Sequence, residues 1–175
     1  MKKITYLIIA LIGLGMIFSC EKENDNPILD MDQANPPAFM EPTSGTTYVL
    51  TEEMADSTIA FSWSSTTYNI TELEDTKYTV QVDLPDSNFV NAKELINTTD
   101  LSFSITYAEI NNILVGMGLE ADSAYDVALR IHSFLNTDSD YSYQYSDPIT
   151  LNFTPYSVDV EVAKLYVPGD YQGWN

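Results

Sequence analysis

The chain has 175 residues, and 26 acidic residues against 7 basic ones give it a formal charge of −19. This length fits one domain with extensions, and a hydrophobic content of 45% is enough to bury a core. The acidic balance argues against binding to nucleic acids or anionic membrane surfaces, which requires basic patches. One cysteine excludes a disulfide framework, and one histidine argues against a histidine-rich metal site. Nucleotide-binding glycine loops and hydrolase or zinc-protease motifs are absent, so no cofactor is expected.

The N-terminus has the layout of a secretory signal. Lys2 and Lys3 precede an apolar run of 13 residues, Tyr6 to Phe18. A transmembrane helix needs about 20 apolar residues, so this run fits the core of a signal peptide instead. The run leads into Ser19-Cys20, which resembles a bacterial lipobox, although Phe18 is bulkier than is usual there. The sequence therefore predicts a lipoprotein signal over residues 1–19 and a lipidated Cys20. The alternative is an ordinary signal peptide with a chance cysteine.

Residues 20–36 are predicted to form a lipidated acidic linker. Loss of the signal removes two lysines and no acid, which changes the formal charge from −19 to −21. The acidic tract at residues 21–25 resembles the signal that sends lipoproteins of some Gram-negative bacteria to the cell exterior. The protein is therefore expected to be anchored in the outer membrane and to face outward.

Between residues 37 and 156, apolar and polar residues alternate in short runs separated by turn residues. This period of two is typical of strands with one buried face. The clearest runs place apolar residues at Ile59, Phe61 and Trp63; Tyr78, Val80 and Val82; Leu101, Phe103 and Ile105; Tyr125, Val127, Leu129 and Ile131; and Ile149, Leu151 and Phe153. Weaker strands are expected near Phe39–Met40 and Tyr48–Thr51. About seven strands predict an all-β fold, an immunoglobulin-like or fibronectin type III sandwich.

One segment has a helical period instead. Its apolar residues, at i, i+3, i+4 and i+7 spacing, are Ile110, Ile113, Leu114 and Met117. Thr106 and Glu109 have the spacing of a capping box, and Gly118 supplies a C-terminal stop. We therefore expect a short helix that covers one end of the sandwich and packs its apolar side into the core.

Two aromatic residues match structural positions of the fibronectin type III pattern. Leu119 stands six residues before Tyr125, which begins an alternating strand. In such domains this tyrosine forms the tyrosine corner, in which its hydroxyl bonds back to the backbone. Trp63 resembles the core tryptophan of the family. Both residues are interpreted as structural, with an exposed sugar platform as the alternative for Trp63.

Candidate chemistry within the sandwich is weak. Four residues have calcium-loop spacing: Asn136, Asp138, Asp140 and Asp147. Tyr141 occupies the position where such a loop needs glycine, so the segment is interpreted as a solvated loop, and no metal site is expected. His132 lies on the polar side of its strand. The alternating Tyr141, Tyr143 and Tyr145 are expected on one face, where they cover an edge strand or, alternatively, stack on sugars.

Residues 157–175 are predicted to begin a second β domain, which the chain does not complete. Leu165–Val167 fits a strand, and Pro168-Gly169 fits a turn. About 19 residues are too few to bury a core of their own.

These features together resemble the N-terminal region of SusE/SusF-type lipoproteins, which belong to bacterial starch-utilisation systems. The resemblance rests on the signal and linker, on Tyr48-Val-Leu-Thr, Phe61-Ser-Trp-Ser and Tyr78-Thr-Val-Gln-Val-Asp, and on the terminal Leu-Tyr-Val-Pro-Gly-Asp-Tyr-Gln-Gly-Trp-Asn. It implies an immunoglobulin-like spacer followed by carbohydrate-binding domains. Related starch-binding modules stack a tryptophan on glucose, and Trp174 matches that place.

The resemblance implies a surface lipoprotein that binds polysaccharide, an α-glucan by expectation, without cleaving it. Other outer-membrane proteins of the same uptake system are expected partners. Two other functions stay open: a surface adhesion or assembly component, and the spacer module of a secreted glycoside hydrolase. The chain itself is predicted not to be an enzyme, because it offers no nucleophile–base pair and no cleft with paired acids.

Overall fold

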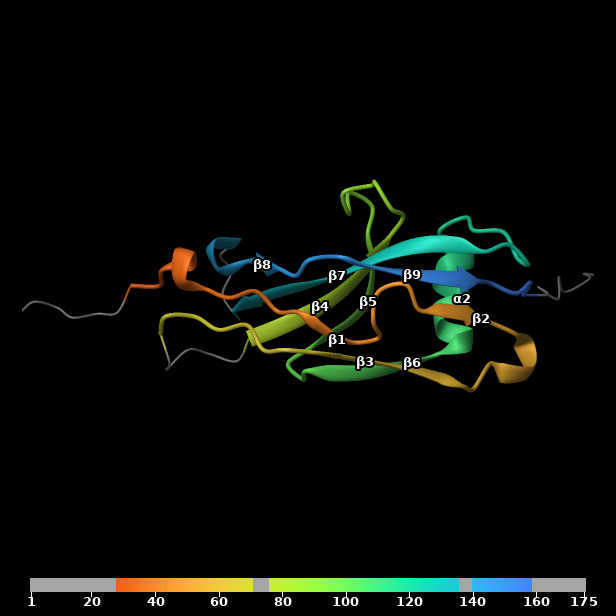
Figure 1. The fold of residues 1–175 in the computed structure, drawn as a ribbon, viewed down its shortest axis with the longest axis horizontal. Helices are drawn as coiled ribbons and strands as arrows, with labels where there is room; N and C mark the ends of the chain where they lie inside the picture. The colour runs from red at the N-terminus through yellow and green to blue at the C-terminus, as the bar shows by residue number, and fades with distance from the viewer. Residues whose placement is uncertain (1–27, 71–75, 136–139, 159–175) are drawn as a thin grey trace, which may run out of the picture.

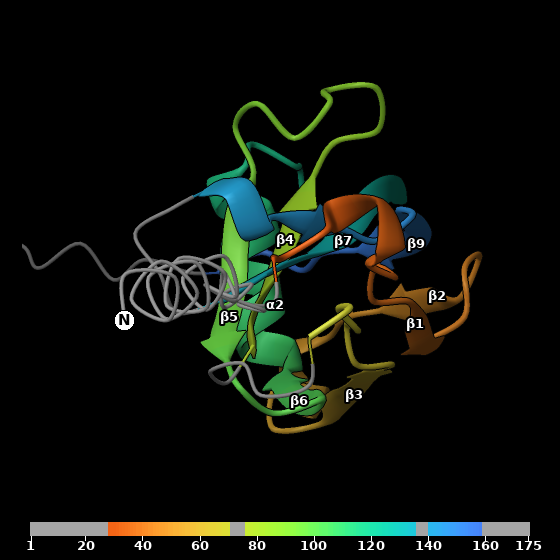
Figure 2. The same cartoon turned by 90° about the vertical axis from the view of Figure 1, so that its left-hand side faces the viewer.

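The computed structural model describes residues 28–70, 76–135 and 140–158. Nine strands in this part of the chain form two sheets that face one another (Figures 1 and 2). The smaller sheet has the order β1(Phe39–Glu41), β3(Thr58–Trp63) and β6(Ser102–Thr106). The larger sheet has the order β2(Thr47–Val49), β9(Ile149–Thr154), β7(Tyr125–Leu135), β4(Thr76–Asp83) and β5(Lys93–Thr98), and β8(Gln144–Tyr145) pairs with β7. This arrangement is an immunoglobulin-like β-sandwich, as the sequence predicted.

Most strand pairs are antiparallel. β4 and β7 form the longest ladder, from Thr76 opposite Leu135 to Asp83 opposite Ala128. β2 and β9 are the parallel exception, with Tyr48 opposite Phe153. The strands lie within the predicted range 37–156, whose exact boundaries as a domain stay a prediction.

The core lies between the sheets and is built from the inward residues of each strand. Phe61 and Trp63 come from β3, and Val80 and Val82 from β4. The strand β7 contributes every second residue, because successive side chains of a strand point to opposite faces. Trp63 is 2% exposed, and its ring centre lies 5.9 Å from that of Tyr78. Trp63 is therefore a core residue, which confirms its structural interpretation.

The predicted helix is α2(Tyr107–Gly116), which lies at one end of the sandwich. The capping box is present: the Thr106 hydroxyl accepts from the Glu109 backbone N–H, and the Glu109 carboxylate accepts from the Thr106 backbone N–H. These hydrogen bonds hold the pKa of Glu109 below its usual value. Ile110 and Leu114 are fully buried, which confirms that the apolar side of the helix is core packing.

The structure adds two strands that the sequence did not predict. β5 carries Leu95 and Ile96 next to each other, so it lacks the alternating pattern, and its pairing with β4 shifts register between Val80 and Gln81. β8 has only two residues. Three 3₁₀ turns complete the described elements: η1(Met31–Gln33), η2(Glu52–Met54) and η3(Asp140–Ser142).

The three tyrosines do not lie along one strand, although all three are exposed, as the alternation predicts. Tyr141 lies in η3, and only Tyr145 lies in a strand. Tyr143 and Tyr145 nevertheless reach the same histidine of β7, His132.

Candidate functional site

Both site residues predicted from the sequence lie outside the described residues. Cys20, the expected lipidation site, precedes residue 28, and Trp174, the expected sugar contact, follows residue 158. Residues 136–139 of the would-be calcium loop also lie outside. Their roles stay predictions.

The outer face of the large sheet carries a column of aromatic and cationic side chains. The Arg130 guanidinium lies over the rings of Phe89 and Tyr145, with its central carbon 4.3 Å from each ring centre. Tyr145 also stacks on His132, with ring centres 4.6 Å apart at 15°. A cation over an aromatic face is favoured by the ring quadrupole. The column runs from the loop after β4, across β7, to β8.

Arg130 is the only arginine in the chain. Its Nε donates to the Gln81 side chain at 2.8 Å, and no carboxylate among the described residues forms an ion pair with it. Although the chain contains 26 acidic residues, Arg130 packs on aromatic rings and not on a carboxylate among the described residues. The terminal N–H groups of the guanidinium fork have no protein acceptor among the described residues, so they can donate to a ligand.

The surroundings of His132 on this face disfavour its protonated form. Partial burial lowers its pKa, and the nearby Arg130 charge lowers the pKa further. Its Nε2 atom is buried and has no hydrogen-bond partner among the described residues, and Tyr143 packs edge-on against its ring at 4.4 Å. The imidazole therefore acts as packing for the tyrosines, and it is placed too deeply to contact a ligand through Nε2.

The loop that brings Phe89 to Arg130 is strained and fixed at its base. Asp86, Asn88 and Phe89 all have positive φ, at 65°, 53° and 58°. Asp and Asn enter this region more readily than other non-glycine residues, whereas a bulky residue such as Phe89 rarely occupies it and pays roughly 1–2 kcal/mol. Strained backbone of this kind clusters at functional sites.

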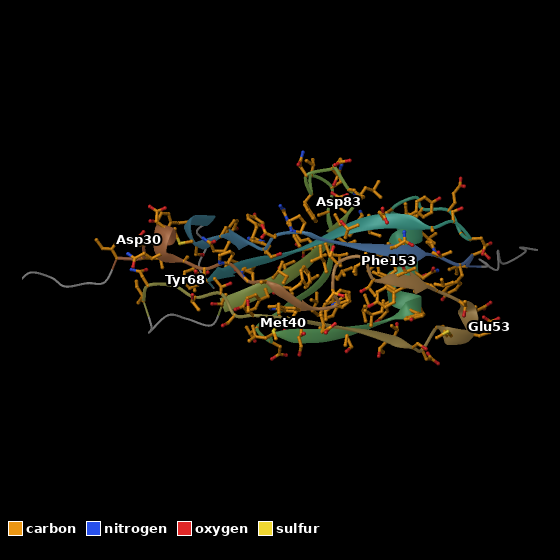
Figure 3. The ribbon with its side chains drawn as sticks, in the orientation of Figure 1. Asp30, Met40, Glu53, Tyr68, Asp83 and Phe153 are labelled. Carbon is orange, nitrogen blue, oxygen red and sulfur yellow. The ribbon has the colours of Figure 1, made fainter. Side chains whose placement is uncertain are left out.

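Asp83 holds the base of this loop. Its buried carboxylate accepts from the backbone N–H of Leu84 at 2.8 Å and of Asn91 at 3.3 Å. The two ends of the loop are thereby joined to one side chain. Figure 3 shows Asp83 where the loop leaves the sheet, and Figure 2 shows the loop projecting beyond it.

A groove of about 410 Å³ lies between this loop and the sheet. Its lining includes Asp86, Asn88, Phe89, Arg130, Tyr145 and Thr150. The groove thus combines aromatic walls with one cationic and one anionic side chain. Its volume falls within the range of about 300–1,000 Å³ for small-molecule sites.

The N-terminal segment is fastened to one end of the sandwich. The Asn69 side chain accepts from the Asp30 backbone N–H at 2.8 Å and donates to the Ile28 carbonyl at 2.9 Å. Asn35 and Thr67 exchange two backbone hydrogen bonds. The chain is therefore held against the sandwich from Ile28 onward.

The exit from β9 is fastened at the other end. The fully buried Asn111 of α2 donates to the Tyr156 carbonyl at 3.1 Å and accepts from the Tyr156 N–H at 2.9 Å. Asp122 adds a backbone hydrogen bond to the Pro155 carbonyl. In Figure 1, η1 and the end of β9 lie at opposite ends of the long axis, and in Figure 3 Asp30 and Glu53 mark these ends. The sandwich thus separates the two parts of the chain that enter and leave it.

Within the described ranges, no group of three or more histidine, cysteine, aspartate or glutamate side chains is placed to hold a metal ion. In the same part of the chain, no helix has the length and apolar character needed to cross a bilayer.

Sequence reasoning missed the column and the groove. It placed His132 on the polar side of its strand, and the same alternation puts Arg130 beside it. No residue pattern around Phe89 predicts its contact with Arg130. The contact depends on left-handed backbone in a loop that contains no glycine to mark it.

The described residues form an immunoglobulin-like β-sandwich whose incoming segment and outgoing segment are held by hydrogen bonds at opposite ends. A family model described as SusE outer membrane protein matches residues 22–132, and the chain belongs to this family. It is therefore a Sus-system outer-membrane protein, as the sequence resemblance predicted.

Two solved structures show weaker likeness. The crystal structure of SusF from Bacteroides thetaiotaomicron is 17% identical, with a TM-score of 0.45, over 73% of this chain and 27% of that one. The fibronectin type-III domain of human fibronectin type III domain containing protein 3 is 9% identical, with a TM-score of 0.37, over 70% of this chain and 85% of that one. No curated protein matches the chain.

Proposed function

We propose that the protein is a lipid-anchored, outward-facing polysaccharide-binding component of its uptake system and does not cleave the polysaccharide. The sandwich acts as the spacer between the anchor at Cys20 and a carbohydrate-binding β domain that begins after Tyr156. An α-glucan is the proposed ligand, and Trp174 supplies the ring that stacks on it.

The observation that carries this proposal is that the chain enters the sandwich near Ile28 and leaves it near Tyr156, with hydrogen bonds holding each segment at opposite ends. Seven residues lie between Cys20 and Ile28, which makes eight steps along the chain, so the linker reaches at most ~30 Å. The Asn111 hydrogen bonds to Tyr156 hold the outgoing chain at the opposite end of the sandwich. An anchor at one end and a binding domain at the other would hold the sugar contact away from the lipid surface.

Family membership supports the proposal because the family is an outer-membrane one. The composition supports the absence of catalysis: the groove on the large sheet contains one carboxylate, Asp86, whereas glycoside hydrolysis ordinarily uses two carboxyl groups facing one bond. Incubation with starch, other glucans and chromogenic glycosides should release no product. Turnover that a single acid substitution abolishes would contradict this part.

Affinity electrophoresis in starch-containing gels tests the binding. The product of the gene read past Asn175 should be retarded, whereas residues 21–175 alone should migrate nearly as in a blank gel. Trp174→Ala in the longer protein should reduce the retardation without lowering the melting temperature. Absence of retardation by any polysaccharide would contradict the proposal and favour the adhesion or assembly function.

A further inference from the structure

We propose that the groove beside Arg130 is a second, weak binding site that takes one unit of a neutral saccharide. This goes beyond the proposed function, in which the sandwich serves only as a spacer. The site is formed by the loop after β4, by β7 and by the segment that follows β8, all within the described residues.

The two charged side chains that line the groove, Arg130 and Asp86, indicate which class of ligand it can bind. Arg130 presents N–H donors without protein acceptors among the described residues, and Asp86 presents an acceptor-only carboxylate on the same groove. A sugar hydroxyl both donates and accepts, so adjacent hydroxyls satisfy both side chains. A carboxylate ligand would satisfy Arg130 alone and be repelled by Asp86. An ammonium ligand would satisfy only Asp86.

The aromatic side chains of the groove can contact the apolar surface of a sugar ring. Phe89 and Tyr145 both line the groove, and Tyr145 is 43% exposed, so the parts of the two rings that Arg130 and His132 leave uncovered can contact a ligand. The clamp fixes the arginine in one orientation before a ligand arrives, which reduces the entropy lost on binding. The bend that places Phe89 there is held through Asp83.

The small size of the groove limits its affinity. One sugar unit makes few contacts, so we expect dissociation constants in the millimolar range, too weak to retard the chain in a starch gel. If the groove is linked to a second binding domain, it would raise the overall affinity for a long polysaccharide, because the second contact then forms at a high effective concentration.

The test is an NMR titration of residues 21–175, which include the whole core of the sandwich. Glucose and maltose are the neutral probes, and glucuronate and glucosamine are the charged ones. Neutral probes should shift the backbone amide signals of Phe89, Arg130 and Tyr145 saturably. Tighter binding of either charged probe, or no saturable shift at these amides, would overturn the proposal.

Variants separate recognition from packing. Arg130→Gln should weaken binding about tenfold, since a charged hydrogen bond is lost, and Asp86→Asn should weaken it while leaving the stacked column intact. Tyr143→Ala is the matched control, because Tyr143 lies on the same face but outside the groove lining. Its affinity should stay within about twofold of the wild type, well inside the effect of one lost hydrogen bond. Equal losses in Asp86→Asn and Tyr143→Ala would overturn the site.

The Trp174→Ala variant distinguishes this site from the proposed function. Its groove signals should shift as in the wild type. Loss of those shifts would assign the binding to Trp174 and refute the groove, whereas intact shifts with an unretarded longer protein would refute the proposed function alone.

Discussion

The hydroxyl of Tyr125 accepts a hydrogen bond from the backbone N–H of Glu120, at 3.3 Å. The bond joins the first residue of β7 to the turn that leads into it, five residues upstream. It is the tyrosine corner that the spacing of Leu119 and Tyr125 predicted. The ring of Tyr125 is half-buried and packs against the core.

Tyr125→Phe should lower the free energy of unfolding by about 1 kcal/mol, the typical net contribution of one hydrogen bond. The ring and its packing remain, so the loss reports the hydroxyl alone. Urea denaturation measures it. Tyr143→Phe, at a tyrosine that is 41% exposed, should change stability much less. Equal effects of the two substitutions would show that the corner contributes nothing specific.

Trp63→Ala should destabilise the sandwich by roughly 3–5 kcal/mol, because it empties a large core position. This is a large share of the ~5–15 kcal/mol that holds a domain folded. Thermal melting followed by circular dichroism measures the loss. Trp63→Phe is the control: the indole Nε1 has no hydrogen-bond partner in the part of the chain that the structure describes, so this change removes ring volume without breaking a hydrogen bond there. A fully stable alanine variant would contradict the core position.

His132 should make the sandwich less stable in mild acid. Its folded pKa is lowered, first by burial and then by Arg130, from the ordinary value of 6.5. Above that value the imidazole is neutral in both states and adds no pH dependence. As the pH falls below it, the unfolded chain binds a proton more readily than the folded one, and the free energy of unfolding decreases.

The His132→Phe variant tests this prediction, since a phenyl ring can still stack on Tyr145 and does not titrate. The groups that face the imidazole are Arg130, Phe134, Tyr143 and Tyr145. The free energy of unfolding of the wild type, relative to that of the variant, should decline from pH 7 to pH 5. This range contains the unperturbed pKa of histidine. A constant difference across this range would contradict the prediction.

Cys20→Ala should release the protein from the membrane fraction, because the only cysteine would no longer carry acyl chains. Fractionation of cells grown with labelled palmitate measures both the label and the location. Ser19→Ala, which keeps a small residue before the cysteine, is the control and should remain anchored. Label in the Cys20→Ala variant would refute lipidation at this residue.

The sequence alone predicted the elements whose patterns are local. The alternation of apolar and polar residues located β3, β4, β6, β7 and β9, because a strand with one buried face has an apolar residue at every second position. Helical spacing, with Thr106 and Glu109, located α2 and its capping box. β5 escaped detection because adjacent apolar residues, Leu95 and Ile96, break the period of two.

The tertiary structure alone decided what the outer face of the large sheet carries. Phe89, Arg130 and Tyr145 lie far apart in sequence, and their contacts depend on the pairing of β7 with β8 and on a left-handed bend that no glycine marks. The fastening of Tyr156 to Asn111, 45 residues away, is likewise set by packing. Local patterns can specify a strand because burial repeats along the chain, whereas a groove between loops depends on which distant segments the folded core brings together.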